Sequence, residues 1–153
     1  MCYTVHMKEL ILLRGPSGSG KSTIARSLGG CHHETDNFYI NGAGVYVFNA
    51  EMIAKAHAWN RQNVRIDMLC EYSPIVVSNT FITHWEMSAY LDMAAKELDY
   101  FVRLIRTPGP WDANVLFKRN KHGVPLSTIE RQIAKYQPHE KDEEWKEISI
   151  FNS

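Results

Sequence analysis

The sequence predicts an α/β fold, in which helices cover both faces of a mostly parallel β-sheet. Two patterns support this prediction. Strand-like and helical segments alternate along the 153 residues, and a glycine-rich turn at 15–20 joins the first strand-like run to the first helical one. Because ligands of such sheets bind at the carboxyl ends of the strands, the residues that follow each strand are the candidates for function.

The first half of the chain contains five expected elements. They are a strand at 8–14, a helix at 21–28, a short strand at 31–36, a hairpin at 38–48 and a long helix at about 50–71. Alternating residues around an Asn-Gly turn predict the hairpin. Asn49 stands where it can cap the long helix, whose apolar residues roughly follow helical spacing.

The second half contains six expected elements. They are a strand at 74–79, a helix at 84–98, a strand at 100–106, a helix at 112–121, a helix from about 127 to 137 and a final strand at 148–151. A β-branched run predicts that the strand at 74–79 is buried. Thr83 with Glu86, and Ser127 with Glu130, have the spacing of capping boxes that begin helices.

Composition and charge are those of one globular domain, which we expect to span residues 1–153. Hydrophobic residues make up 44% of the chain and the formal net charge is zero, so no global basic field attracts nucleic acid. Three widely spaced cysteines, Cys2, Cys31 and Cys70, indicate reduced thiols and a cytoplasmic location. No apolar run approaches the ~20 residues of a membrane helix, and residues 1–7 are too polar for a signal peptide.

The turn after the first strand fits the phosphate-binding pattern G-x-x-x-x-G-K-[ST]. Glycines let successive backbone N–H groups approach phosphate oxygens, and the following helix adds unpaired N–H groups and a positive dipole end. Lys21 is expected to reach the β- and γ-phosphates of ATP, and the Ser22 hydroxyl to bind Mg²⁺. The expected nucleotide-binding residues are Gly15, Pro16, Ser17, Gly18, Ser19, Gly20, Lys21, Ser22 and Thr23.

Asp36 is the candidate general base. It is expected at the carboxyl end of the strand at 31–36, beside the strand that carries the phosphate loop. Phosphoryl transfer to an alcohol requires a group that accepts the hydroxyl proton and orients the oxygen toward the γ-phosphate, and a carboxylate does both. Asp36 is also a candidate Mg²⁺ ligand, together with Ser22. The alternative is an aspartate that caps the following turn.

Charge is unevenly distributed along the chain although its sum is zero. The stretch 103–135 is basic and the stretch 140–147 is acidic. We interpret residues 108–126 as a helical lid over ATP, in which Arg119 stabilises charge on the transferring phosphoryl group. For most of the lysines in this region, the alternative is a solvated helix face.

Two further groups of residues have side chains that could bind ligands. Cys31-His32-His33-Glu34 contains metal-ligating types, but neighbouring strand residues point to opposite faces, so no structural metal is expected there. Aromatic residues beyond the strand ends could stack an acceptor base or simply pack. The candidate acceptor-binding residues are Tyr39, Asn79, Thr80, Phe81 and Trp85, and Trp111 is a further aromatic residue of this kind.

Together these residues resemble the 5′-hydroxyl polynucleotide kinases of phage and of eukaryotic repair enzymes. They resemble still more closely the kinase-like domains of the NEDD-four-binding-protein family. The resemblance spans roughly residues 8 to 137 and rests on motifs in a fixed order. These are the phosphate loop, Thr35-Asp36-Asn37-Phe38, Ala56-His57-Ala58-Trp59-Asn60, Val77-Ser78-Asn79-Thr80, Trp85-Glu86-Met87, Pro110-Trp111 and Arg119-Asn120-Lys121-His122-Gly123-Val124.

The resemblance implies a three-layer P-loop NTPase fold, a five-stranded parallel sheet of order 2-3-1-4-5, and ATP with Mg²⁺ as phosphate donor. It also implies that Asp36 is the base and Arg119 the lid residue. Two positions depart from the family pattern. The arginine that polynucleotide kinases place three residues beyond the aspartate is Tyr39 here, and the acid after the third strand is Asn79. An aromatic side chain at that first position is compatible with an acceptor recognised through its base, as in phage kinases that phosphorylate hydroxymethyl-pyrimidines within DNA.

We therefore expect an ATP-dependent kinase that transfers the γ-phosphate to a hydroxyl of a nucleic acid, either a 5′-hydroxyl end or a hydroxymethylated base in DNA. A nucleoside, a nucleotide or another small molecule is the alternative acceptor. A function of a different class is a nucleotide-dependent binding module with little kinase activity. The departure at Asn79 is the feature that favours this last alternative.

Overall fold

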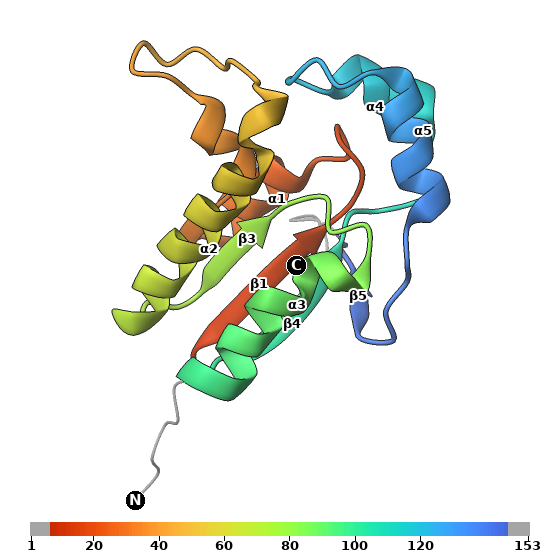
Figure 1. Ribbon diagram of the computed structural model, residues 1–153. Helices are drawn as coiled ribbons and strands as arrows, with labels where there is room; N and C mark the ends of the chain where they lie inside the picture. The colour runs from red at the N-terminus through yellow and green to blue at the C-terminus, as the bar shows by residue number, and fades with distance from the viewer. Residues whose placement is uncertain (1–6, 147–153) are drawn as a thin grey trace, which may run out of the picture.

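The computed structural model describes residues 7–146, and its centre is a parallel five-stranded sheet (Figure 1). The strands are β1 (Glu9–Arg14), β2 (Cys31–His33), β3 (Ile75–Ser78), β4 (Phe101–Arg106) and β5 (Asp142–Glu144). They lie in the order β2-β3-β1-β4-β5, which confirms the predicted order. Leu12 of the central strand β1 is paired with Val77 of β3 and with Leu104 of β4. The phosphate loop therefore leaves the sheet from the middle of its carboxyl edge.

Helices cover both faces of the sheet and complete the three predicted layers. The covering helices are α1 (Lys21–Leu28), α2 (Ile53–Leu69), α3 (His84–Asp92) and the π-helical segment η3 (Met93–Leu98), and two further helices, α4 (Ala113–Arg119) and α5 (Leu126–Lys135), lie outside these layers. α1 packs against Ile11 and Leu13 of β1. On the opposite face, α2, α3 and η3 cover Leu10 and Leu12. Alternate residues of β1 point into two separate cores, which explains the continuous apolar run.

α4 and α5 lie beyond the carboxyl edge of the sheet, and the segment 40–52 lies across this edge from them (Figure 1). The two helices pack on each other. α4 lies within residues 108–126, the segment that the sequence predicted as a lid, and α5 begins where this segment ends. Among the helices within residues 7–146, none is both long and apolar enough to cross a membrane.

The region after β2 differs from the expected strand and hairpin. β2 is three residues long, and a 3₁₀ helix, η1 (Thr35–Tyr39), follows it, so Asp36 lies in a turn beyond the strand. The expected hairpin at 38–48 is reduced to one antiparallel bridge between Ile40 and Tyr46. Most apolar side chains of this segment are exposed, because no second layer covers them.

The predicted helix caps were correct at two of three places. Thr83 and Glu86 form a complete capping box at the start of α3. The Asn49 side chain accepts a hydrogen bond from the backbone N–H of Glu51 and so caps the short 3₁₀ helix η2 (Ala50–Met52) that precedes α2. The box expected at Ser127 is wrong. α5 begins at Leu126, directly after Pro125, so Ser127 already lies inside the first turn.

The fifth strand is formed by acidic residues. β5 is paired with β4, with Asp142 opposite Leu104 and Glu144 opposite Arg106. An edge strand tolerates charged side chains because one of its sides remains open to water. The strand that the sequence predicted at 148–151 lies outside the described residues.

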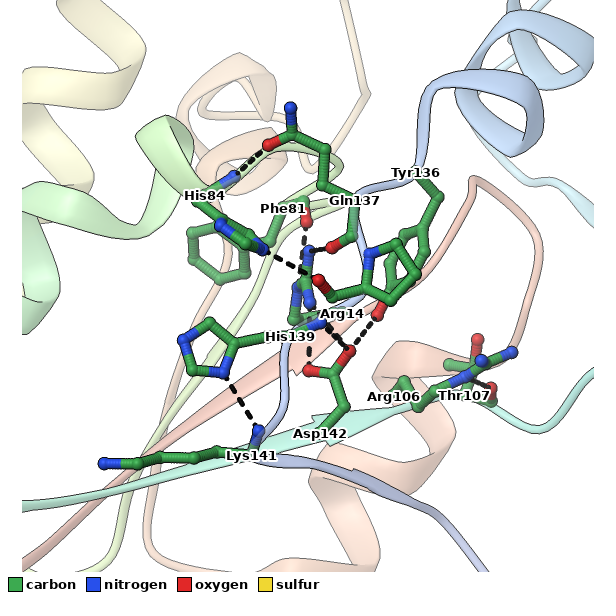
Figure 2. Close-up of polar contacts among 11 residues, drawn as sticks. Arg14, Phe81, His84, Arg106, Thr107, Tyr136, Gln137, His139, Lys141 and Asp142 are labelled. Atoms are coloured by element: carbon green, nitrogen blue, oxygen red, sulfur yellow. Dashed lines mark hydrogen bonds and ion pairs between the residues drawn. The ribbon is translucent and has the colours of Figure 1, made fainter.

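Arg14, the last residue of β1, is fully buried and holds β5 in place (Figure 2). Its guanidinium donates to both carboxylate oxygens of Asp142, each at 2.9 Å. Its Nε donates to the backbone carbonyl of Phe81 at 3.0 Å, and its Nη2 to that of Gln137 at 2.7 Å. The ring of Tyr136 stacks on the guanidinium, with its centroid 4.4 Å away. One buried cation thus joins the residue before the phosphate loop to three later segments of the chain.

Candidate nucleotide-binding and phosphotransfer site

The carboxyl edge of the sheet opens into a cavity of about 860 Å³. Its walls come from the phosphate loop and α1, from η1, from the segment after β3 and from the loop between α4 and α5. Most of the expected site residues line it: Ser17, Gly18, Gly20, Lys21, Ser22, Thr23, Asp36, Tyr39, Asn79, Thr80 and Arg119. The fold therefore brings the phosphate loop, the candidate base and the candidate lid arginine into one space.

The phosphate loop follows a path that requires glycine. Gly18 and Gly20 have φ angles of 80° and 101°, in the left-handed region. A Cβ on Gly18 would lie 2.2 Å from the carbonyl oxygen of Leu116, so the loop touches α4 at this point. The backbone N–H of Ser17 donates to the side-chain oxygen of Gln132 at 2.9 Å. Both α4 and α5 are thereby packed against the loop.

Lys21 begins α1, and its ammonium group folds back over the phosphate loop. Its Nζ donates to the carbonyl oxygens of Gly15 at 2.9 Å and of Pro16 at 3.0 Å. Burial lowers the pKa of Lys21 to about 8, and the nearby carboxylates of Asp36 and Glu34 oppose this shift. A phosphate group near Nζ would add negative charge and stabilise the ammonium form.

Asp36 lies at the meeting point of three segments. Its Oδ1 accepts a hydrogen bond from the Tyr46 hydroxyl at 3.3 Å, and its Oδ2 lies 3.8 Å from Nε2 of His122, in the loop between α4 and α5. The rings of Tyr46 and His122 pack together with centroids 4.3 Å apart. Burial and the negative charge of Asp36 raise the pKa of Tyr46, so the hydroxyl stays a donor. The Asp36 side chain is 47% exposed and open to the cavity.

Asn79 and Thr80 line the cavity and also hold its frame together. The Asn79 side-chain oxygen accepts a hydrogen bond from the backbone N–H of Thr35 at 3.0 Å, and so fixes the start of the turn that carries Asp36. The carbonyl oxygen of Thr80 accepts a hydrogen bond from the backbone N–H of Gly15 at 3.0 Å. The amide at position 79 therefore has a supporting contact that a carboxylate could also make.

The aromatic candidates for acceptor stacking have different positions. Tyr39 is nearly buried but lines the cavity, and its ring packs against Phe48 with centroids 5.0 Å apart. Phe81 is 2% exposed and packs in the core, and Trp85 is 82% exposed and outside the cavity. Trp111 packs under the guanidinium of Arg106 and also lies outside the cavity. Stacking of an acceptor by Phe81 was wrong, because its ring faces the core.

The cations around the cavity come from both sides of it. Arg119 is the last residue of α4, and Lys121 follows it in the loop toward α5. Arg26, on α1, lines the opposite part of the cavity. All three residues are exposed, so their side chains are free to reorient toward a phosphate.

Glu34 is a site residue that the sequence reasoning missed. Its two carboxylate oxygens accept the Ser22 hydroxyl at 3.1 and 3.3 Å, and the Ser78 hydroxyl lies 3.5 Å from one of them. Glu34 lines the same cavity as Asp36. The sequence signal that could have revealed it is its position, two residues before Asp36 and directly after a strand.

The oxygen atoms around Ser22 suit a magnesium ion. Mg²⁺ prefers carboxylate, hydroxyl and phosphate oxygens and keeps several of its waters. The hydroxyl of Ser22 and the carboxylates of Glu34 and Asp36 provide such oxygens within one cavity. Across residues 7–146 no group of three or more His, Cys, Asp or Glu is arranged to hold a metal without further ligands.

A phosphate loop on the central strand of a parallel sheet in this order defines the P-loop kinase fold. Residues 10–139 match the family described as an AAA domain, and the chain belongs to this family. It is 39% identical over 137 residues to NEDD4-binding protein 2 of Homo sapiens, a match that covers 84% of this chain and 8% of that protein. It is 36% identical over 85 residues to the nickel import ATP-binding protein LarO of Lactiplantibacillus plantarum, covering 52% of this chain and 32% of LarO. The chain thus spans a small part of each relative.

Several solved kinase structures share the fold. A chain of the Pnkp1/Rnl/Hen1 RNA repair complex superposes with a TM-score of 0.61 at 22% identity, over 87% of this chain and 45% of that chain. The gluconokinase of Sinorhizobium meliloti gives a TM-score of 0.55 at 17% identity, over 91% and 82% of the two chains. The APS kinase CysC of Mycobacterium tuberculosis gives 0.58 at 15% identity, over 90% and 88%. These neighbours confirm the predicted P-loop kinase fold.

Proposed function

We propose that this protein is an ATP-dependent kinase that transfers the γ-phosphate of ATP to a hydroxyl group of a nucleic acid. The observation that carries the proposal is the position of Asp36. Its carboxylate shares one cavity with the phosphate loop, and it is close enough to Lys21 to influence the pKa of that ammonium group. Transfer to an alcohol requires a base and a phosphate-binding cation side by side.

The donor half of the site would be formed by the phosphate loop and the lid. The loop amides and Lys21 would bind the β- and γ-phosphates, and the Ser22 hydroxyl with a carboxylate of the same cavity would hold the accompanying Mg²⁺. Mg²⁺, when bound with ATP, would neutralise part of the charge of the phosphates. Residues 108–126 would act as the lid, and Arg119 would stabilise the charge on the transferring phosphoryl group.

The acceptor half of the site is where Asp36 would act. The acceptor oxygen forms a bond to the γ-phosphorus, the bond from that phosphorus to ADP breaks, and the hydroxyl proton moves to Asp36. The Tyr46 hydroxyl and the His122 ring contact the two carboxylate oxygens of Asp36 and would fix their direction. Because Asp36 remains about half exposed, it has room to receive a substrate hydroxyl.

Two features of the cavity support a nucleic acid as the acceptor. Tyr39, Tyr46 and Phe48 form an aromatic wall near Asp36, and aromatic rings stack nucleobases of any sequence. Arg26 and Lys121 add positive charge that suits a phosphate backbone. The fold likeness to a chain of an RNA repair complex agrees with this choice. The acceptor hydroxyl would be a 5′-hydroxyl end or that of a hydroxymethylated base.

The test of this proposal is transfer of label from γ-labelled ATP to a panel of acceptors. The panel contains 5′-hydroxyl DNA, 5′-hydroxyl RNA, DNA with hydroxymethylated bases, and free nucleosides. We expect label in at least one of the polynucleotides. Label in nucleosides alone, or nucleosides that outcompete the polynucleotides, would replace the nucleic acid with a small molecule.

Two other functions have a specific observation in their favour. The gluconokinase and the APS kinase share the fold over most of their length, which favours a small-molecule acceptor. Similarity to LarO, named as an ATP-binding protein of nickel import, favours a nucleotide-dependent binding module. Such a module would bind ATP and label no acceptor in the panel.

A further inference from the structure

We propose that Glu34 provides the carboxylate of the magnesium site, acting together with the Ser22 hydroxyl, in place of an acid after β3. The residue after β3 that could have filled this role is Asn79, which has no negative charge. The inference rests on the ATP-binding part of the proposed function. It does not depend on the identity of the acceptor.

The contact between Ser22 and Glu34 is the first support. The Ser22 hydroxyl lies within hydrogen-bond distance of both Glu34 oxygens, at 3.1 and 3.3 Å. A hydroxyl has one proton and two lone pairs, so a proton directed at the carboxylate leaves the lone pairs available for a cation. P-loop NTPases hold Mg²⁺ through this serine position and a nearby acid.

The competing oxygen ligands are the second support, because they are engaged elsewhere. The two Asp36 oxygens face the Tyr46 hydroxyl and the His122 ring. The side-chain oxygen of Asn79 accepts the backbone N–H of Thr35. Glu34 is therefore the carboxylate in contact with Ser22, whereas the side-chain contacts of Asp36 are with Tyr46 and His122.

The position of Glu34 in the fold is the third support. It follows β2 directly and lies beside β3, where the Ser78 hydroxyl is 3.5 Å from one of its oxygens. Glu34 thus contacts Ser22 from the end of β2, whereas the acid of the family pattern follows the third strand, β3. Both carboxylates interact with the charge of Lys21, so each lies close to where the ATP phosphates would bind.

This arrangement makes a prediction with opposite signs in the presence and absence of metal. Without a divalent cation, the Glu34 carboxylate repels the phosphates of ATP, so Glu34→Gln should bind ATP as tightly as the native protein or more tightly. With Mg²⁺, the carboxylate helps to hold the ion, so Glu34→Gln should lose affinity. Loss of a residue that supports a metal costs about 10-fold or more in metal affinity.

The experiment measures the affinity for ATP by calorimetry, in EDTA and in excess Mg²⁺, for the native protein and Glu34→Gln. We expect the ratio of the ATP affinity in Mg²⁺ to the ATP affinity in EDTA to be lower in the variant than in the native protein by about 10-fold or more. Glu130→Gln is the matched control, because it removes an exposed carboxylate of α5 outside the cavity and should leave the ratio unchanged. Asp36→Asn tests the rival carboxylate of the cavity, and its ratio should fall by less than that of Glu34→Gln. Electron paramagnetic resonance of Mn²⁺ with ATP provides a second readout, and we expect a changed spectrum only for Glu34→Gln.

Several outcomes would overturn this inference. They are an unchanged ratio, a ratio that falls equally in Asp36→Asn, or an equal loss of affinity with and without Mg²⁺, which indicates a structural role. If Glu34→Gln fails to fold by circular dichroism, Glu34→Asp takes its place. Its shorter side chain withdraws the carboxylate from Ser22, so a reduced Mg²⁺ effect supports the inference and an unchanged one contradicts it. A normal Mg²⁺ effect with no labelled acceptor would overturn the proposed function and leave the role of Glu34 intact.

Discussion

Replacement of Asp142 by asparagine tests the buried ion pair that fixes the last strand of the sheet. Arg14 immediately precedes the phosphate loop, and its side chain has no exposed surface, while that of Asp142 is 8% exposed. The two carboxylate oxygens of Asp142 each accept a hydrogen bond from Arg14 at 2.9 Å (Figure 2). Asp142→Asn keeps the size of the side chain but leaves the guanidinium buried without a counter-charge.

The expected cost follows from this burial. Removing one partner of a buried ion pair destabilises a protein by about 3–5 kcal/mol, because the remaining charge is uncompensated. The next residue of β5 provides an internal control. Glu143 pairs with Arg103 at 3.0 Å, but these side chains are 53% and 35% exposed. An exposed pair contributes about 0.2–1 kcal/mol, so Glu143→Gln should cost no more than this.

The assay is urea unfolding followed by circular dichroism, with the free energy of unfolding compared among variants. Arg14→Met combined with Asp142→Leu removes both charges, and we expect it to recover a large part of the stability lost in Asp142→Asn. Equal costs for Asp142→Asn and Glu143→Gln would refute the reasoning. A double variant as unstable as Asp142→Asn alone would show that an uncompensated charge is not the cause.

Three further predictions concern the site. Asp36→Asn should lose transfer almost completely while ATP affinity, measured by calorimetry, stays within about 3-fold, and unchanged turnover would remove Asp36 from the mechanism. Because the pKa of Lys21 is lowered to about 8, ATP affinity should decline as the pH rises through 8 and the ammonium loses its proton. Lys21→Ala should lose both the affinity and this pH-dependent decline. If Lys21→Ala shows the same decline, another group causes it. Tyr46→Phe keeps the ring that packs on His122 but removes the hydrogen bond to Asp36. The rate of transfer should therefore fall by roughly 10-fold, with ATP affinity unchanged. An unaltered rate would show that Tyr46 does not position Asp36.

The phosphate loop could be predicted because its signals are local, whereas the sheet order followed from the family resemblance. The apolar run before Gly15, the glycines and the helix after Lys21 are contiguous, so each supports the others in the sequence. The capping box at Thr83 has the same local character and was also correct. The box at Ser127 failed because the N-cap is Pro125, two residues earlier.

What could not be predicted depends on contacts between distant segments. Arg14 and Asp142 are 128 residues apart, and neither belongs to a sequence pattern that predicts a buried ion pair. The acidic stretch 140–147 has the composition of a solvated surface. Part of it nevertheless forms β5, because Arg14 compensates the charge of Asp142. Periodicity also gave no reason to separate Phe81 from Tyr39, although one packs in the core and the other lines the cavity.

Contacts between segments that are distant in the sequence also explain which residues of the site were not predicted. Asp36 was found because a carboxylate after a strand is a recognisable signal, but Tyr46 and His122 reach it from segments that have no motif of their own. Glu34 was set aside with a row of metal-ligating side chains, and its contact with Ser22 requires two elements to meet in space. The phosphate loop and Asp36 could therefore be singled out from the sequence, and the contacts of Asp36 with Tyr46 and His122 could not.

The position of the label in the product is the most direct test of phosphotransfer to a nucleic acid. The native protein and Asp36→Asn are incubated with γ-labelled ATP and with 5′-hydroxyl DNA, 5′-hydroxyl RNA or DNA that carries hydroxymethylated bases. Digestion of the products to nucleotides then locates the label. The account predicts label on one of these hydroxyl oxygens with the native protein and almost none with Asp36→Asn. ATP that is bound but leaves every polynucleotide unlabelled, or equal labelling by both proteins, would contradict it.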